Sequence, residues 1–294
     1  MDASLLTPAV RQLIALSLEE DLAGGDITSD AIFDTETVGH ATFRAKQELV
    51  LAGCPIAEAV LREVDPRLTV KWAARDGQRI GTGAFGTVSG PVRSLLRGER
   101  AALNFIRKLS GVATTTATFA ALLRGTETRL LDTRKTTPGF RALEKYAVRM
   151  GGGHNHRMDL SAGAMLKNNH IDAAGGIEAA VRKVRARAPF LTMIEVEVRN
   201  EDEAAKAVAA GADAILLDNM PLELLQRIAA TYRGRIRLEA SGNVTLATLE
   251  ALGKAGVDYV SSGWLTHSAP AADISLTIGG SFAAAPILET LATP

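Results

Sequence analysis

The stretch TMIEVEVRNEDEAAKAVAAGADAILLD, residues 192–218, contains the unit that decides the fold. Its two short apolar runs flank a helix-like segment, for which Asn200 is a plausible N-cap with Glu203 three residues later, as in a capping box. Similar runs begin at Ile236 and Val257, so successive runs start 22, 22 and 21 residues apart. Strands that alternate with helices at this spacing favour a parallel sheet covered by helices.

This repeat favours an α/β barrel rather than an open sheet. The region has room for six or seven such units, whereas a complete eight-stranded barrel usually takes about 250 residues. We therefore predict an incomplete, six- or seven-stranded α/β barrel over residues 113–270. Residues 1–112 are expected to form a separate N-terminal α/β domain. Its expected elements are a helix over 9–22, strands near 41–44, 68–72 and 85–89, and two helical stretches, 93–108 and 112–124, where it meets the barrel.

The composition excludes several classes of protein. Among 294 residues, 47% are apolar, and 33 basic and 33 acidic side chains give a formal net charge of zero. This balance argues against disorder and against a basic surface for nucleic acid. A single cysteine, Cys54, excludes a disulfide framework. No apolar run approaches the roughly 20 residues that span a bilayer, and the acidic residues after Leu18 are unlike a signal peptide, so we expect a cytoplasmic protein with no membrane partner.

The barrel repeat also predicts where the chemistry lies, because barrel active sites form at the carboxyl ends of the strands. Those ends are Glu197, Asp218, Ser241-Gly242 and Ser262-Gly263. The two carboxylates suit Mg²⁺ or substrate hydroxyls, although pairing with Lys or Arg is the alternative. Glu195 shares a strand face with Glu197 and is a weaker candidate. The Ser-Gly pairs suit close approach of the backbone to phosphate.

Residues 129–170 carry eight basic and three acidic side chains, together with three of the five histidines. Arg134 and Lys135 follow an apolar run and should lie at the mouth of the barrel, where they suit carboxylate or phosphate. A further basic patch, Arg97, Arg100 and Arg107, falls on a predicted helix. His154 and His156 could suggest a metal pair, but no cysteine or third ligand lies nearby. Three more cations spaced four apart favour a solvated helix face: Arg141, Lys145 and Arg149.

The segment DTRKTTPGFRALEKYAVRMGGGHNHR, residues 132–157, resembles the signature of the quinolinate phosphoribosyltransferase family. The resemblance extends over nearly the whole chain. It includes LEEDLAGGDITS at 18–29, GERAALNFIRKLSGVAT at 98–114, and the strand ends IEVEV, LLDNM, EASGN and SSGWLTHS. The chain differs from the usual pattern at Ala162, Asn168 and Trp264.

The resemblance implies a reaction between quinolinate and phosphoribosyl pyrophosphate that yields nicotinate mononucleotide, pyrophosphate and CO₂ in NAD biosynthesis, with Mg²⁺. It implies an N-terminal α/β open-faced sandwich, a tail over 271–294 that packs back on it, and a homodimer with shared active sites, or a larger assembly. Arg100 would enter the partner's site. Lys135, Glu197 and Asp218 would be catalytic, and the two acids would bind Mg²⁺ directly or through water. The other implied substrate-binding residues are Thr133, Arg134, His156, Arg157, Lys167, Ser241, Gly242, Asn243, Ser262, Gly263 and Trp264.

Two alternatives stay open from the sequence. One is a paralogue of the same fold, either associated with molybdenum transport or acting on nicotinate; the intact TRK and HR motifs, residues 133–135 and 156–157, argue against it. The other is a barrel that binds a phosphosugar without turning it over, for which Glu197 and Asp218 would be unnecessary.

Overall fold

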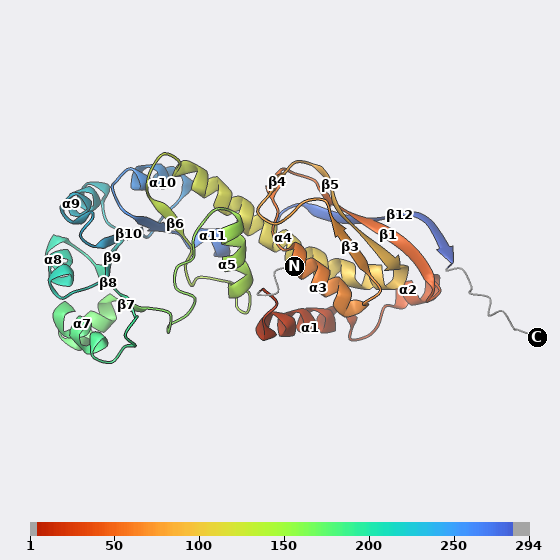
Figure 1. Cartoon of the computed structure of the whole chain (residues 1–294), viewed down its shortest axis with the longest axis horizontal. Coiled ribbons are helices and arrows are strands. Elements are labelled where there is room, and N and C mark those ends of the chain that lie inside the picture. Colours follow the sequence, from red (N-terminus) through yellow and green to blue (C-terminus); the bar gives the residue numbers. More distant parts are fainter. Residues whose placement is uncertain (1–4, 285–294) are drawn as a thin grey trace, which may run out of the picture. The chain divides into compact units, whose positions relative to one another are not determined.

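The computed structural model describes residues 5–284 and divides the chain into two compact units (Figure 1). The first comprises Met1–Thr114 and Pro270–Pro294, and the second Thr115–Ala269. The boundary predicted at 112/113 falls inside a helix. Residues 285–294 of the predicted tail lie outside the described residues.

The first unit is built on a four-stranded antiparallel sheet in the order β12-β1-β5-β3. A separate two-stranded antiparallel ladder is formed by β2 and β4, which come between β1 and β5 along the chain. The tail pairs with β1 through β12, so the last described strand belongs to the sheet of the N-terminal part of the chain. The elements are α1 (Pro8–Leu22), α2 (Ile27–Ile32), β1 (Thr37–Ala45), β2 (Leu49–Val50), α3 (Cys54–Val64), β3 (Thr69–Trp72), β4 (Arg79–Ile80), β5 (Gly83–Pro91) and β12 (Ile274–Ala284).

An aromatic cluster helps to form the core of this unit. Phe43 packs against Trp72 and Phe85, with ring centroids 4.9 and 5.9 Å away. Gly86 makes room for the indole, because a Cβ there would lie 2.5 Å from the Trp72 ring. These contacts fix β1, β3 and β5 to one another on one face of the sheet.

Helix α4 (Val92–Leu122) runs without interruption from the first unit into the second. The prediction of two separate helices was therefore wrong. Gly111, at the expected break, stays helical and serves packing instead: a Cβ there would lie 2.0 Å from the carbonyl oxygen of Pro270. The returning chain thus lies directly against the helix backbone at this point.

The second unit is an incomplete barrel of six strands, as the sequence predicted. Its strands follow the order β6-β11-β10-β9-β8-β7 and every neighbouring pair is parallel. Among the described residues, β6 and β7 have no strand between them, so the barrel stays open at that side. The elements are β6 (Arg129–Leu131), α5 (Arg141–Met150), β7 (Ala164–Leu166), α6 (Asn168–Ala174), α7 (Ile177–Arg185), β8 (Ile194–Val198), α8 (Glu201–Ala209), β9 (Ala214–Asp218), α9 (Leu222–Tyr232), β10 (Arg237–Ser241), α10 (Leu246–Gly253), β11 (Tyr259–Ser261) and α11 (Trp264–His267).

The strand register brings the predicted functional ends together. Glu197 pairs with Leu216, and Asp218 pairs with Ser241, so β8, β9 and β10 end at one edge. In β8, Ile194, Val196 and Val198 are buried and alternate with two glutamates. Alternation sends Glu195 and Glu197 to the opposite face, toward the barrel interior. No helix within residues 5–284 has both the length and the apolar character needed to cross a membrane.

Candidate active site

The carboxyl ends of the barrel strands surround a pocket of about 650 Å³, called here the substrate pocket. It collects most of the predicted site residues from six separate segments. Arg100 lies outside this lining: it is exposed on α4, in the first unit. The lining residues are Thr133, Arg134, Lys135, His156, Arg157, Met165, Lys167, Glu197, Leu216, Asp218, Asn219, Glu239, Ser241, Gly242, Asn243 and Ser261.

Cations and carboxylates meet across this pocket. The Lys167 ammonium lies 3.7 Å from Glu197 Oε2, and the Lys167 side chain is 55% exposed. Burial above all, and the nearby charge of Arg134, lower the pKa of Arg157. Cations that repel one another in a partly buried pocket are stabilised when an anion binds between them.

A network of amides fixes Asp218. Asn219 donates from Nδ2 to Asp218 Oδ2 at 2.8 Å, and its Oδ1 accepts from Asn243 Nδ2 at 2.9 Å. Asn219 and Asn243 both adopt positive φ, 53° and 48°. Gly242, at φ +89°, lies under this network, and a Cβ there would be 2.3 Å from the Asn219 side chain.

The second Ser-Gly pair is placed differently from the first. Ser262 is buried, and its amide donates to the Leu131 carbonyl at 3.0 Å. Gly263 lies behind a lysine of the pocket, because a Cβ there would be 2.9 Å from Lys135 Cδ. Trp264 is about half exposed. None of these three residues lines the substrate pocket.

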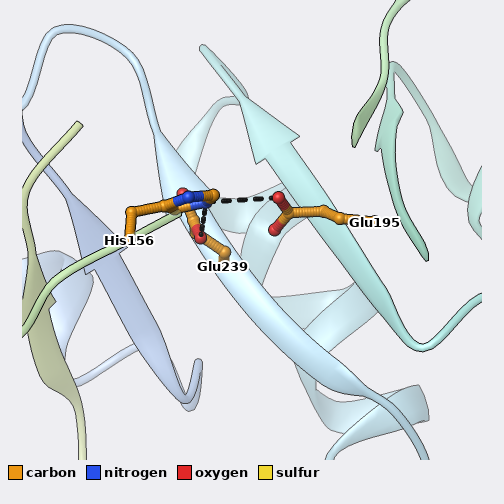
Figure 2. A group of neighbouring side chains, drawn as sticks. All are labelled: His156, Glu195 and Glu239. Atoms are coloured by element: carbon orange, nitrogen blue, oxygen red, sulfur yellow. Dashed lines mark ion pairs between the residues drawn. The ribbon is translucent and has the colours of Figure 1, made fainter. Parts of the chain in front are cut away.

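At the base of the pocket, two glutamates from different strands approach the same ring nitrogen of His156 (Figure 2). Its Nε2 is 3.3 Å from Glu195 Oε2, on β8, and 3.2 Å from Glu239 Oε2, on β10. The three side chains are only 15%, 12% and 5% exposed. Burial alone lowers the pKa of His156, but the hydrogen bonds and charges of the two carboxylates outweigh burial and raise it.

The contact made by Nδ1, the other ring nitrogen of His156, shows which nitrogen carries the proton. The Arg157 amide donates to His156 Nδ1 at 2.7 Å, so Nδ1 has a free lone pair and Nε2 carries the proton. This contact opposes the rise in the pKa, because a protonated Nδ1 cannot accept.

The hydrogen bond from the Arg157 amide to His156 Nδ1 also bears on whether His156, Glu195 and Glu239 could bind a metal ion. Within residues 5–284, His156, Glu195 and Glu239 are the group whose ligand atoms lie close enough to hold an ion. A metal at Nε2 would move the ring proton to Nδ1, where the Arg157 amide already points. The residues of this cluster therefore do not fit a metal.

A buried ion pair supports the loop that carries His156. Lys145, fully buried, contacts Asp132, which also accepts from the His156 amide at 2.8 Å. Lys145 donates to the His156 carbonyl at 3.0 Å. Burial, first of all, raises the pKa of Asp132 and lowers that of Lys145. The expectation of a solvated helix face was wrong for Lys145, because this face of α5 packs onto the loop; Arg149 is exposed as expected.

Sequence reasoning assigned no role to Glu239 or Asn219. Glu239 lies two residues before Ser241, so strand periodicity would have placed both on one face of β10. Asn219 follows Asp218 directly, in a left-handed conformation that asparagine tolerates better than most residues.

Comparisons with known proteins identify the family. The quinolinate phosphoribosyl transferase N-terminal domain model matches residues 26–110, and the C-terminal domain model matches 112–277. The chain belongs to the quinolinate phosphoribosyltransferase family. A probable nicotinate-nucleotide pyrophosphorylase [carboxylating] of Bacillus subtilis is 42% identical to this chain, over 88% of the chain and 90% of the relative. A chloroplastic nicotinate-nucleotide pyrophosphorylase [carboxylating] of Arabidopsis thaliana is 41% identical, over 92% and 82%.

Solved structures agree with this membership. NadC from Streptococcus pyogenes is 42% identical, with a TM-score of 0.89 over 94% of this chain and 99% of that one. The nicotinate-nucleotide pyrophosphorylase of Francisella tularensis is 39% identical, with a TM-score of 0.88 over 92% and 96%. The resemblance in the sequence is thereby confirmed, and with it the prediction of a decarboxylating, phosphoribosyl-transferring enzyme of NAD biosynthesis.

Proposed function

We propose that quinolinate and phosphoribosyl pyrophosphate bind together in the substrate pocket and react there to give nicotinate mononucleotide, pyrophosphate and CO₂. One observation carries this assignment: four cations, Arg134, Lys135, Arg157 and Lys167, share a single cavity with Glu197 and Asp218. Both substrates are polyanions with a polar or aromatic body, so they need cations for their charges and acceptors for the ribose hydroxyls.

The cations would hold the quinolinate carboxylates and the phosphate groups. Arg134 and Arg157 offer planar forks that match carboxylate geometry, whereas Lys135 and Lys167 act as point charges. Burial above all, and then the charge of Arg134, lower the pKa of Arg157, and a dianion that binds between the two guanidinium groups would offset this repulsion. The Thr133 side chain is held near these cations in the pocket lining, because its hydroxyl oxygen accepts from the Lys135 amide at 3.0 Å.

Glu197 and Asp218 would bind the ribose hydroxyls. Ser241, Gly242 and Asn243 would face the 5′-phosphate with backbone donors, and positive φ at Gly242 and Asn243 turns the backbone for close approach. Gly263 would support the same end from behind Lys135, and Ser262, Gly263 and Trp264 all lie outside the lining of the pocket.

The donor set at Glu197 and Asp218 fits Mg²⁺, because both side chains offer carboxylate oxygens at adjacent strand ends of one pocket. These two residues would hold the ion directly or through water. When bound together with pyrophosphate, Mg²⁺ would neutralise part of the charge of the leaving group.

The reaction would proceed by direct displacement. The quinolinate nitrogen attacks the anomeric carbon as the bond to pyrophosphate breaks. Positive charge develops on the sugar, and the carboxylates of Glu197 and Asp218 stabilise it. Lys135 and its neighbouring cations stabilise the departing pyrophosphate. As CO₂ leaves, the electron pair of the C2–carboxylate bond stays on C2, where the adjacent pyridinium nitrogen stabilises it, and a proton from solvent then forms the C2–H bond, so this step needs little help beyond positioning.

We further propose that the protein is cytoplasmic and works as a homodimer, or as a larger assembly of such dimers. Arg100 supports this proposal: it is an exposed cation on α4 and lies outside the lining of the chain's own substrate pocket. In a dimer it would enter the pocket of the partner subunit.

A turnover assay tests the assignment. Purified protein is incubated with quinolinate, phosphoribosyl pyrophosphate and Mg²⁺, and both nicotinate mononucleotide and CO₂ are followed. A parallel reaction contains nicotinate instead of quinolinate. We expect both products in the first reaction only. Product from nicotinate without CO₂ would contradict the quinolinate assignment.

Two substitutions test the pocket itself. Arg134→Ala and Lys135→Ala each remove a charged contact to substrate, so we expect kcat/KM to fall by about tenfold or more. Lys254→Ala, at an exposed Lys–Glu pair on α10, is the control and should keep full activity. Full activity in either pocket variant would contradict the assignment.

A further inference from the structure

Two buried carboxylates behind His156 take no part in the reaction described above. Glu195 and Glu239 both approach the same Nε2, at 3.3 and 3.2 Å. One acceptor is enough to satisfy one N–H group. A second buried carboxylate is unfavourable, because burial and repulsion between like charges both act against it. Burial, first of all, raises the pKa of Glu195, and the charge of Glu239 raises it further.

The cluster lies between two cavities of the barrel. The second cavity, of about 490 Å³, opens at the amino ends of the strands, where Ala164, Ala214 and Arg237 contribute to its lining. His156 and Glu239 line both cavities, whereas Glu195 lines only the second. The imidazole thus separates Glu195 from the substrate pocket.

We propose that Glu195 and Glu239 are positioning residues for quinolinate binding, which fix the orientation of the His156 imidazole in the substrate pocket through its Nε2–H. The inference rests on the proposed function, because it takes a dianion as the ligand of the substrate pocket. The Arg157 amide donates to the other ring nitrogen, Nδ1. Both nitrogens are therefore engaged, which fixes the plane of the ring that lines the substrate pocket.

Other charged groups around His156 are already engaged. Asp132 at the end of β6 pairs with Lys145 of α5, and both bind the backbone of His156 rather than its ring. The Arg157 guanidinium donates to the Gly163 carbonyl at 2.9 Å. The remaining titratable groups that line the second cavity with the cluster are Arg237 and Tyr259. The two glutamates are therefore the charges that act most directly on the ring.

Glu239→Gln separates positioning from a structural role. Glutamine keeps the shape and one acceptor oxygen but removes the charge. We expect the KM for quinolinate to rise about tenfold, the KM for phosphoribosyl pyrophosphate to stay unchanged, and the melting temperature to stay level or rise, because one of two neighbouring buried charges is gone. Glu58→Gln, whose side chain is 12% exposed in the other unit, is a matched control and should change neither KM.

The pH profile gives a second readout. A cationic His156 is present below its pKa, and the carboxylates raise that pKa. Removing one carboxylate lowers it, so the alkaline limb of kcat/KM for quinolinate should move down by about one pH unit in Glu239→Gln. Nitrogen NMR of the ring reports the same change directly: His156 should lose its charge at a lower pH in the variant than in the wild type.

A variant with an unchanged quinolinate KM, an unchanged alkaline limb and a lower melting temperature would overturn the proposal and assign the cluster a structural role. Failure of the proposed function looks different: the wild type would then not turn over quinolinate at all. In that case the NMR titration of His156 without substrate still reports whether the two carboxylates control its charge, and equal titrations in wild type and variant would refute that control.

Discussion

At the scale of single residues, the substrate pocket depends on close contacts that leave no room for extra atoms. Gly242 combines φ +89° with the Asn219 side chain at 2.3 Å from the position of a Cβ. Asn219 in turn bonds both Asp218 and Asn243. One glycine therefore controls the orientation of a carboxylate to which we assign the ribose hydroxyls.

Gly242→Ala should move Asn219 and release Asp218 and Asn243. We expect the KM for phosphoribosyl pyrophosphate to rise about tenfold, which corresponds to the loss of roughly one charged hydrogen bond. Gly211→Ala is the control: its φ is +78° with nothing within 4 Å, so it shares the backbone strain without the clash. Equal kinetics in the two variants would mean that the contact with Asn219 does not matter.

At the scale of elements, one acid connects three of them in the first unit. Asp65 caps the end of α3, bonds Arg67 just before β3, and accepts from Ser94 of α4 at 2.7 Å. The hydrogen bonds from Arg67 above all, and from Ser94, hold the pKa of this carboxyl well below its usual range. The Arg67 side chain is 60% exposed, so solvent screens its charge.

Asp65→Asn should lower the free energy of unfolding at pH 7 by about 1–3 kcal/mol. A native pKa below the unfolded value of about 3.9 means that this stabilisation is present above that value and is lost as the pH falls. Chemical denaturation of wild type and variant should therefore show a difference at pH 7 that shrinks toward pH 3. A difference of equal size at both pH values would contradict the assignment. Glu250→Gln, in an exposed pair, should have little effect at either.

At the scale of the whole molecule, the two units contribute different parts of the proposed enzyme. The barrel holds the substrate pocket, and the first unit carries Arg100 on α4. If two copies share their sites, a symmetric dimer supplies each pocket with one Arg100 from the partner subunit.

Mixing two inactive variants tests this arrangement. Arg100→Ala and Lys135→Ala are each expected to lose most activity alone. After subunit exchange, a heterodimer contains one site with neither change, so activity should recover to about a quarter of the wild-type value for random pairing. Co-refolding followed by the turnover assay measures it. No recovery, with exchange verified by mass, would place Arg100 outside the partner's site.

The sequence by itself determined the family, the incomplete barrel and the ends of the strands that line the pocket. Those features follow from local patterns. The 22-residue repeat predicts where the strands lie, and Glu197, Asp218 and Ser241 mark their carboxyl ends. The tertiary structure decided which side chains share space. It placed Glu239 and Glu195 on the ring of His156, buried Lys145 against Asp132, and kept α4 continuous through Gly111. Each of these results depends on neighbours that are distant along the chain, and burial and charge act through those neighbours.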